Sequence, residues 1–260
     1  MTTDTLQGAV APPNSRLHDA GSRGRKARKI TAILRDAGRG DLSSLHCLDV
    51  GCATGLMTRI LAPSFSQMLG VEYEEGALVC TADDGTGVPR ATNTLLVRGD
   101  AMHLPLPDAS VDLVICAQVY EHVHDADAMA AEIWRVLAPG GACFFSGPNR
   151  LAVMEEHCHL PFVSWLPRSL ANAYVRLMGR GPRYEEAPRT WWGLRRLWRD
   201  FEIVDYTVAM IEDPAKYECA EESAALAWFG RLPGWLLRAL TPLYPNYNWV
   251  LFKRGGEVSS

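Results

Sequence analysis

The segment LDVGCATG, residues 48–55, constrains the fold of this chain more than any other. An apolar run ends at an acid, and a turn of small residues leads into an apolar stretch with helical spacing. This pattern is typical of a strand, a tight turn and a helix. Small residues let the backbone approach a ligand closely, and a helix that begins near Gly55 directs free N–H groups at it. The segment therefore predicts a ligand site at the carboxyl end of a buried strand.

The position of the acid narrows the kind of ligand. A nicotinamide-binding turn reads G-x-G-x-x-G and has its acid about 20 residues further on. Here the spacing is G-x-A-x-G, and the acid precedes the turn. A carboxylate at this place suits a ligand with an ammonium group, such as S-adenosylmethionine (SAM). The residues predicted to contact the methionine part of SAM are Asp49, Gly51 and Gly55, with Cys52 and Ala53 in the same turn.

Length and composition favour one ordinary globular domain. The chain has 260 residues, of which 48% are hydrophobic and 22% charged. The net charge of −4 gives no general reason to expect nucleic acid as a partner. Seven scattered cysteines, and a polar start without a signal peptide, indicate a reducing, cytoplasmic location. No apolar run approaches the ~20 residues that span a bilayer.

The basic run RGRKARK, residues 23–29, is a local exception to the acidic balance. It lies in a helix expected from Ser22 to about Ala37, with Ala27, Ile30 and nearby apolar residues facing inward. We interpret the run as the solvated face of this helix, with an anion-binding patch as the alternative.

Strands and helices alternate along most of the chain, which indicates a parallel sheet with helices on both faces. Ligands of such sheets bind beyond the carboxyl ends of the strands, near the topological switch point. The expected helices include one that carries Leu56, Ile60 and Leu61 and stops before Pro63, and others at about 75–82 and 125–137. The expected strands are about His46–Val50, Gln67–Glu72, Thr94–Gly99, Val111–Ala117, Ala142–Ser146, Phe201–Ile211 and Tyr247–Lys253.

Two insertions interrupt the alternation. Residues 150–189 form the first, which we expect on the acceptor side, with a helix at about 167–178. Residues 212–245 form the second, with helical stretches at 221–229 and 235–240. We expect a disordered tail over 1–15, a single domain over 16–254 and a short tail over 255–260.

Polar groups at successive strand ends suit one nucleoside. Glu72 ends the second strand, where a carboxylate can accept from both ribose hydroxyls, and Tyr73 can lie against adenine. Asp100 ends the third strand, where it can accept from the adenine amino group, and Met102 can pack on the other ring face. Gln118 follows the fourth strand and faces the methionine end.

At this point the chain resembles class I SAM-dependent methyltransferases, in particular the small-molecule group with ubiquinone- and menaquinone-type methylases. The resemblance covers about residues 25–150 and rests on LDVGCATG (48–55), GVEYEEGAL (70–78), VRGDAMHLPLPDASVDLVICAQVYEHV (97–123) and EIWRVLAPGG (132–141). From residue 149 onward the chain is similar to a bacterial subgroup with a run like His-x-His-Leu-Pro-Phe-x-Ser-Trp-Leu-Pro-Arg.

The resemblance implies a Rossmann-like α/β fold. Its seven-stranded sheet is mostly parallel, with helices on both faces, an antiparallel last strand and helical insertions that form a lid. Ala53 stands where many members have Gly, and its one added methyl group should leave cofactor binding intact. The implied SAM contacts are Asp49, Gly51, Glu72, Asp100, Ala101 and Gln118.

Four histidines, His122, His124, His157 and His159, are candidates for catalysis. Methyl transfer from a sulfonium is an in-line displacement that often needs a base, and histidine suits that role near neutral pH. His122 follows the fourth strand, although Glu121-His122 could instead begin and cap a helix. His157 and His159 lie in the polar cluster 155–159, and His157 is the favoured base. The i, i+2 spacing is not typical of a dedicated metal site, so no metal is predicted.

Four residues are candidates for the acceptor pocket. Tyr120 either lines that pocket or packs in the core, and Asn149 belongs to a turn near the acceptor. Phe162 and Trp165 represent the aromatic residues of the insertions. These form a core, a pocket for a large apolar acceptor, or a surface that touches a membrane. Arg168 and the arginines that follow it suit an interfacial helix or an anionic acceptor.

The sequence thus predicts a bacterial-type enzyme of small-molecule biosynthesis. It would transfer a methyl group from SAM to a small or lipophilic acceptor and release S-adenosylhomocysteine. Oxygen is the preferred acceptor atom, with carbon or nitrogen as alternatives. Two other hypotheses are a SAM-binding protein that does not transfer methyl, and an RNA methylase that uses the basic run 23–29. The acceptor's identity and the oligomeric state are left undetermined.

Overall fold

The computed structural model describes residues 19–74, 78, 86–89, 91–155, 157–219 and 232–254. Four expected features lie outside these ranges: the tail 1–15, most of the helix 75–82, the helical stretch 221–229 and the tail 255–260. Every strand expected from the sequence lies within the described part of the chain.

Seven strands form one sheet in the order β3-β2-β1-β4-β5-β7-β6. Neighbouring strands are parallel except at β7, which runs antiparallel to both β5 and β6. The predicted Rossmann-like topology with an antiparallel last strand is confirmed. The strands are β1 (His46–Val50), β2 (Gln67–Glu72), β3 (Thr94–Arg98), β4 (Val111–Ala117), β5 (Leu137–Pro148), β6 (Phe201–Asp205) and β7 (Asn246–Lys253).

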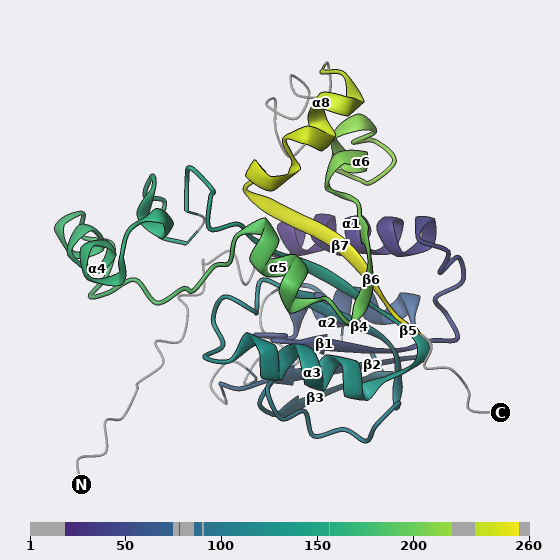
Figure 1. The fold of residues 1–260 in the computed structure, drawn as a ribbon. Coiled ribbons are helices and arrows are strands. Elements are labelled where there is room, and N and C mark those ends of the chain that lie inside the picture. Colours follow the sequence, from purple (N-terminus) through teal and green to yellow (C-terminus); the bar gives the residue numbers. More distant parts are fainter. Residues whose placement is uncertain are drawn as a thin grey trace, which may run out of the picture.

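Helices cover both faces of the sheet (Figure 1). They are α1 (Ala20–Asp36), α2 (Leu56–Leu61), α3 (Ala126–Val136), α4 (Arg168–Leu177), α5 (Trp191–Leu197), α6 (Thr207–Glu212) and α8 (Gly234–Ala239), with 3-10 turns at Ala62–Ser64, Val163–Trp165 and Thr241–Leu243. Successive strand residues point to opposite faces. Leu113 and Ile115 of β4 therefore pack with α1 and α2, whereas Val114 and Cys116 pack with α3 and α5.

Two strand boundaries differ from the prediction by more than two residues, while the end of β3 and the start of β7 differ by one residue and the end of β5 by two. β5 already begins at Leu137, because Leu137 pairs with Val111 and an irregularity between Val111 and Leu113 absorbs the Pro-Gly-Gly turn. β6 ends at Asp205, because the Asp205 side chain accepts a hydrogen bond of 2.8 Å from the backbone N–H of Thr207, where a helix begins. The strand predicted through Ile211 was therefore wrong in its second half, which is α6.

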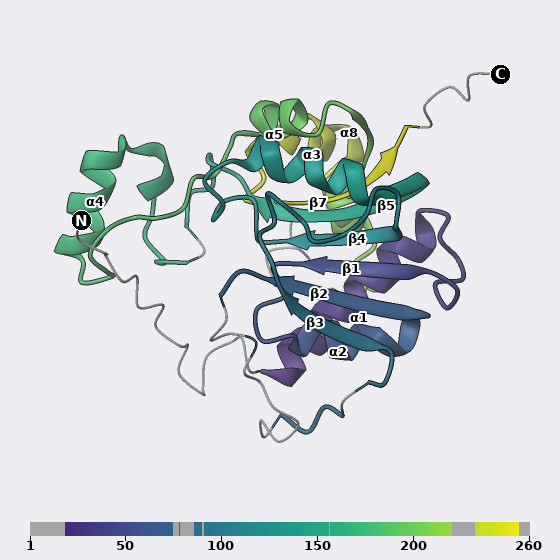
Figure 2. The same ribbon diagram turned by 90° about the horizontal axis from the view of Figure 1, so that it is seen from below.

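The switch point of this topology lies between β1 and β4. These strands are neighbours, and the chain proceeds from them toward opposite edges of the sheet. In Figure 2 the arrows of β1, β2 and β4 point toward the side on which α4 lies. The segment that carries α4 extends away from the sheet in both ribbon views. The first insertion thus borders the edge of the sheet where ligands of such folds bind.

Candidate active site

A cavity of about 1320 Å³ lies at the switch point. Sites for a single small ligand typically measure about 300–1,000 Å³, so this cavity has room for a cofactor and a second molecule. Its wall comes from α1, the turn after β1, the ends of β4 and β5, the start of β7 and the first insertion. Gly51, Cys52, Ala53 and Gln118 are the predicted cofactor-binding residues among its lining residues.

The turn after β1 requires glycine at two positions. Gly51 and Gly55 have φ values of 66° and 70°, in the left-handed region that favours glycine. A Cβ on Gly51 would lie 2.7 Å from Val119 Cγ2, and one on Gly55 would lie 2.4 Å from Leu96 Cδ1. Ala53 adopts a φ of 49°, so the residue that departs from the family pattern also has left-handed backbone. The backbone of this turn is thereby held open to the cavity.

Asp49 lies buried at the end of β1. Its Oδ2 accepts a hydrogen bond of 2.6 Å from Thr58 Oγ1. Burial raises the pKa of Asp49 to about 6, against the opposing effects of this hydrogen bond and the charges of Lys26 and Arg23. At neutral pH the carboxylate is ionised, and it therefore favours a positive group in the adjoining turn.

Glu72 is held in one orientation by three backbone N–H groups. Its Oε2 accepts from Ala53 at 2.8 Å, and its Oε1 accepts from Tyr73 and Glu74 at 2.8 and 3.1 Å. A carboxylate has about four acceptor positions, and these contacts use two on Oε1 and one on Oε2, so Oε2 can still accept from one ribose hydroxyl. Acceptance from both ribose hydroxyls stays a prediction. The Tyr73 side chain is 66% exposed and accessible to a ligand, although its stacking on adenine stays a prediction.

Asp100 shapes the turn that follows β3. Its Oδ1 accepts a hydrogen bond of 2.8 Å from the backbone N–H of Met102, and its Oδ2 lies 3.8 Å from His103 Nδ1. The Met102 side chain is buried in the core cluster beneath this turn, whereas Ala101 is half-buried. The adenine contacts expected for Asp100, Ala101 and Met102 stay predictions, and burial leaves Met102 little surface for a ring.

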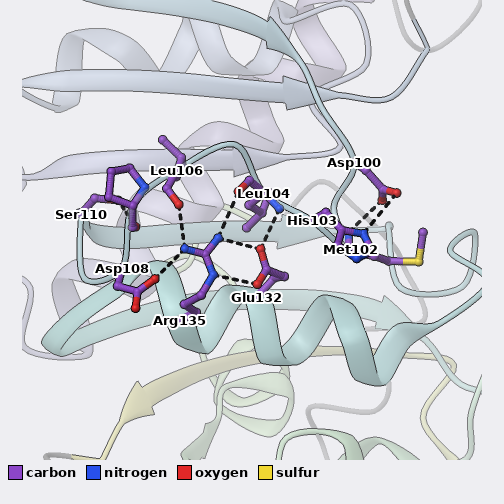
Figure 3. Close-up of polar contacts among 10 residues, drawn as sticks. Asp100, Met102, His103, Leu104, Leu106, Asp108, Ser110, Glu132 and Arg135 are labelled. Carbon is purple, nitrogen blue, oxygen red and sulfur yellow. Dashed lines mark hydrogen bonds and ion pairs between the residues drawn. The ribbon is translucent and has the colours of Figure 1, made fainter.

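The loop after this turn is fastened to α3 by one arginine (Figure 3). Arg135 donates hydrogen bonds to the backbone carbonyls of Leu104 and Leu106. It also pairs with Glu132 at 2.7 Å and with Asp108 at 2.8 Å. These contacts fix the path of the chain from β3 to β4, and with it the position of the Asp100 turn.

Gln118 follows β4 with a left-handed φ of 62°. Its backbone N–H donates to Ser146 of β5, and its Nε2 donates to Asn246 Oδ1 of β7 at 3.2 Å. Its Oε1 is buried and has no hydrogen-bond partner in the described part of the chain. A buried acceptor without a partner is costly. The Gln118 carbonyl is therefore well suited to receive a donor from a ligand in the cavity.

Three of the four candidate histidines line the same cavity, and His124 is not among its lining residues. His122 follows Gln118 in the loop after β4, while His157 and His159 come from the first insertion. The rings of His122 and His157 meet edge to face, with centroids 4.9 Å apart. His157 Nδ1 lies 2.8 Å from Glu155 Oε1. Segments far apart in the sequence thus bring the predicted base and its alternatives together.

The two ring partners have opposite pKa shifts. The hydrogen bond to Glu155 raises the pKa of His157 to about 8, against the effect of burial. Burial, together with the charge of His157, lowers the pKa of His122 to about 4. Burial would raise the pKa of Glu155, but hydrogen bonds from His157 and the Cys158 backbone lower it to about 2. Because Glu155 is ionised and only accepts, His157 Nδ1 carries a hydrogen and leaves Nε2 for another partner.

Carboxylates gather around these rings. Glu121, His122 and His157 offer ligand atoms within 4.8 Å of one another, and so do Glu155, His157 and Glu186. Either group is close enough to hold a divalent ion, but the Nδ1 of His157 is already bonded to Glu155. The predicted independence from metal stays a prediction.

The cavity floor contains polar residues that sequence reasoning missed. Asn246 and Asn248 line it from β7, and Ser146 lines it from β5. Asn246 Nδ2 donates to Ser146 Oγ at 3.3 Å. The sequence did contain a signal for this polar surface, because two asparagines that are two residues apart in an apolar strand lie on the same face of the sheet.

Two predicted acceptor-binding residues are structural, so these predictions need correction. Tyr120 is only 1% exposed, its hydroxyl donates to the Pro148 carbonyl, and it accepts from the backbone N–H of Arg189. Asn149 is also buried, and its Nδ2 donates to two backbone carbonyls and to Tyr247 Oη. Both side chains join the first insertion to the body of the domain, and neither lines the cavity.

A Tyr120→Phe variant tests this correction. We expect it to lower the free energy of unfolding by about 1–3 kcal/mol, because the buried carbonyl of Pro148 and the N–H of Arg189 lose a partner. SAM affinity should be unchanged. Chemical denaturation gives the first quantity and calorimetry the second. A variant with normal stability and an altered Michaelis constant for the acceptor would instead indicate that Tyr120 binds the acceptor.

Other sequence expectations also change. Glu121-His122 does not begin a helix, because α3 begins at Ala126 and Asp125 caps it by accepting from Ala128 N–H at 3.0 Å. Phe162 and Trp165 pack on each other at 5.0 Å, are about half exposed, and are not among the lining residues of the cavity. The structure therefore does not bring these aromatic rings to the site.

The basic run is not simply a solvated face. Arg23, Arg25, Lys26 and Lys29 line the cavity, and only Arg28 among the five basic residues is classed as exposed. The helical spacing of the basic residues indicated a cationic face of this helix, since residues 25, 26 and 29 lie on one face. The sequence could not show that this face meets a cavity, because distant residues, Met154, Glu155, His157 and His159, line the same cavity.

The fold and the groups at its strand ends define a Rossmann-like domain of the methyltransferase type. Residues 48–145 match a family described as a methyltransferase domain. A probable SAM-dependent methyltransferase of Mycolicibacterium smegmatis is 36% identical over 104 residues, which are 40% of this chain and 38% of that protein. A ubiquinone biosynthesis O-methyltransferase of Methylococcus capsulatus is 32% identical over 112 residues, 42% of this chain and 46% of that protein.

A solved structure extends the likeness in fold. The SAM-dependent methyltransferase from Mesorhizobium loti superposes with a TM-score of 0.53 at 17% identity, over 87% of this chain and 97% of that chain. This chain spans less than half the length of the two curated relatives above. The predicted resemblance to SAM-dependent methyltransferases is confirmed, and residues 48–145 carry the methyltransferase domain.

Proposed function

We propose that this chain transfers the methyl group of SAM to an oxygen atom of a small-molecule acceptor. The observation that carries the proposal is the Glu155–His157 pair in the same cavity as the glycine turn. A cavity of about 1320 Å³ accommodates an acceptor beside the cofactor. The names of the relatives, a SAM-dependent methyltransferase and a ubiquinone O-methyltransferase, support this class of reaction.

The cofactor site would hold SAM at the switch point. Asp49 and the unpartnered Gln118 Oε1 would receive its ammonium group at the turn after β1. Glu72, whose orientation is fixed by backbone N–H groups, would accept from the ribose hydroxyls. Asp100 would accept from the adenine amino group. SAM supplies an electrophilic methyl carbon on a positively charged sulfur.

His157 is the proposed base and Glu155 its positioning residue. In its neutral form His157 has a free lone pair on Nε2, because Glu155 holds the hydrogen of Nδ1. Nε2 would take the proton of an acceptor hydroxyl as the oxygen forms its bond to the methyl carbon. The bonding pair of the broken C–S bond stays on sulfur, and S-adenosylhomocysteine leaves neutral at that atom. A base with a pKa of about 8 is well matched to a phenolic hydroxyl, whose pKa is about 10.

His122 and His159, the other two histidines that line the cavity, are weaker candidates for the base. His122, with its pKa lowered to about 4, is neutral at pH 7 but binds a proton poorly. It packs on the His157 ring and orients it. His159 lines the cavity with a left-handed φ of 54°, and no carboxylate is seen to orient it in the described part of the chain. Both are proposed to shape the acceptor side of the cavity.

The placement of the basic run favours a small acceptor over RNA. Four of its cations line the same cavity as the glycine turn and His157. No helix among the described residues is long and apolar enough to cross a membrane. On α4, however, Leu170 and Leu177 are exposed, and Leu177 is 84% exposed, which agrees with peripheral contact to a membrane or with a lipophilic acceptor.

An assay with methyl-labelled SAM tests the proposed function. The purified full chain is incubated with hydroxylated aromatic compounds, and both labelled acceptor and S-adenosylhomocysteine are measured. We expect label in a hydroxyl-bearing acceptor at equal rates with and without EDTA. Tight SAM binding without label transfer to any compound would favour the SAM-binding protein that does not transfer methyl. Loss of the reaction with EDTA would assign a metal to the histidine cluster.

A further inference from the structure

The cavity has a cationic wall that the proposed chemistry does not use. Arg25, Lys26 and Lys29 lie three and four residues apart on one face of α1, and Arg23 joins them at the cavity. The opposite face of α1 is apolar and packs on the sheet. Arg28 points elsewhere and pairs with Glu218 at 3.4 Å. Four cations of a single helix thus line one cavity.

The protein supplies little negative charge to balance this wall. Within the described part of the chain, no ion pair is formed by Arg23, Arg25 or Lys26. Glu155 is the one acid among the lining residues of the described cavity, and His157 already pairs with it. Burial, together with the charges of Arg23 and Lys29, lowers the pKa of Lys26 to about 8.

The buried acid nearest this wall does not cancel it. Asp49 attracts both Arg23 and Lys26, and Glu121 attracts Lys26. Asp49 is assigned to the ammonium group of the cofactor, and Glu121 lies 3.8 Å from His122 Nε2, so these two acids do not balance the four cations. Partly buried like charges repel, so this arrangement is costly while the cavity holds only water.

The cofactor increases the need for an anion. SAM has one carboxylate, but its ammonium and sulfonium groups leave it with a net charge of about +1 at neutral pH. Binding SAM therefore adds positive charge to a cavity that is already positive. Arg23 or Lys26, the two cations that Asp49 attracts, can pair with the SAM carboxylate, and Arg25 then faces the second molecule.

We infer that the acceptor carries an oxyanion, a carboxylate or a phosphate, which binds Arg25 and its neighbours on α1 while the hydroxyl to be methylated faces His157. This inference rests on the proposed methyl transfer and names its substrate class. Arginine forms paired hydrogen bonds with both kinds of oxyanion, so the wall recognises their shared chemistry. It also orients the acceptor, because its anionic end and its reacting oxygen are held on opposite walls.

Arg25→Gln is the variant that tests this inference, because Arg25 lines the cavity and is not one of the two cations, Lys26 and Arg23, that lower the pKa of Asp49. The control is Arg28→Gln, which makes the same charge change on the same helix outside the cavity. Calorimetry is performed on each protein saturated with S-adenosylhomocysteine, at neutral pH and low ionic strength. The probes are benzoate, its uncharged analogue benzamide, and phenyl phosphate, so that carboxylate and phosphate are compared separately.

We expect wild type and Arg28→Gln to bind at least one anionic probe about tenfold or more tighter than benzamide. In Arg25→Gln the preference should fall to about twofold, while S-adenosylhomocysteine binds as in wild type. Equal binding of benzamide and both anions, a preference that survives in Arg25→Gln, or no binding of any probe would overturn the inference. Failure of wild type to bind S-adenosylhomocysteine would overturn the proposed function, and the inference with it.

Discussion

A Glu155→Gln variant is expected to shift the pH dependence of methyl transfer to lower pH. In the wild type the pKa of His157 is raised to about 8 by Glu155. A base works only when unprotonated, so the wild-type rate should rise with pH to an inflection near 8. Removing the carboxylate removes the main cause of the raised pKa, and the inflection moves down. The maximal rate should also fall, because the ring is no longer oriented.

Other groups face His157 and limit the size of this shift. Glu186 and Glu121 also raise its pKa, and His122 lies against its ring. These groups remain in the variant, so the inflection should move toward the ordinary histidine value without passing far below it.

Removal of the base itself should have the larger effect on rate. We expect His157→Ala to lower kcat by about 100-fold or more without changing SAM affinity. His46→Ala is the matched control, because His46 is exposed at the amino end of β1, away from the cavity. Measurement of kcat and kcat/KM from pH 6 to about 9.5 covers the expected inflection. A wild-type rate in His157→Ala, or an unchanged profile in Glu155→Gln, would contradict the assignment of the base.

An Asp49→Asn variant is expected to be more stable than the wild type but to bind SAM more weakly. Burial raises the pKa of Asp49 to about 6, above its ordinary value. The folded protein therefore holds this proton more tightly than the unfolded chain, and stability is lost as pH rises through about 6. Asparagine avoids this cost and can still accept from Thr58. At neutral pH we expect a gain of about 1–3 kcal/mol.

The loss of SAM affinity in the same variant should be about tenfold or more, because the ammonium group loses a charged partner. The control is Asp112→Asn, which makes the same chemical change in β4. The Asp112 side chain accepts a hydrogen bond of 2.9 Å from the backbone N–H of His46, at the amino end of β1. That control should bind SAM normally. Thermal unfolding with and without SAM measures both effects. Lower stability with normal SAM binding would make Asp49 a structural residue.

The strands near the switch point could be predicted from sequence because their signals are local. β1, β2 and β4 have their predicted bounds, since each is an apolar run between clear turn residues. The end of β6 was missed because Val208 and Ile211 suit a buried strand as well as a helix, and the deciding hydrogen bond comes from Asp205. Short apolar runs are ambiguous in this way.

The site was predictable where the backbone alone determines it. The glycine turn and Glu72 follow strand ends, so topology places them. The choice between pocket and core for Tyr120, and the surroundings of the basic run, could not be decided locally because long-range packing determines them. Pro148 and Arg189 bond the buried Tyr120 hydroxyl, and Met154, Glu155, His157 and His159 line the same cavity as α1. A local sequence pattern does not predict which distant segment of the chain packs against a polar face.

The uptake of S-adenosylhomocysteine by the full chain tests the central claim most directly. Titration calorimetry should show saturable binding of one molecule per chain with a dissociation constant in the micromolar range or below, about −8 kcal/mol or stronger. The glycine turn, the fixed Glu72 carboxylate and the open Gln118 carbonyl all predict this result. The absence of heat, together with an unshifted unfolding temperature at millimolar ligand, would contradict the account.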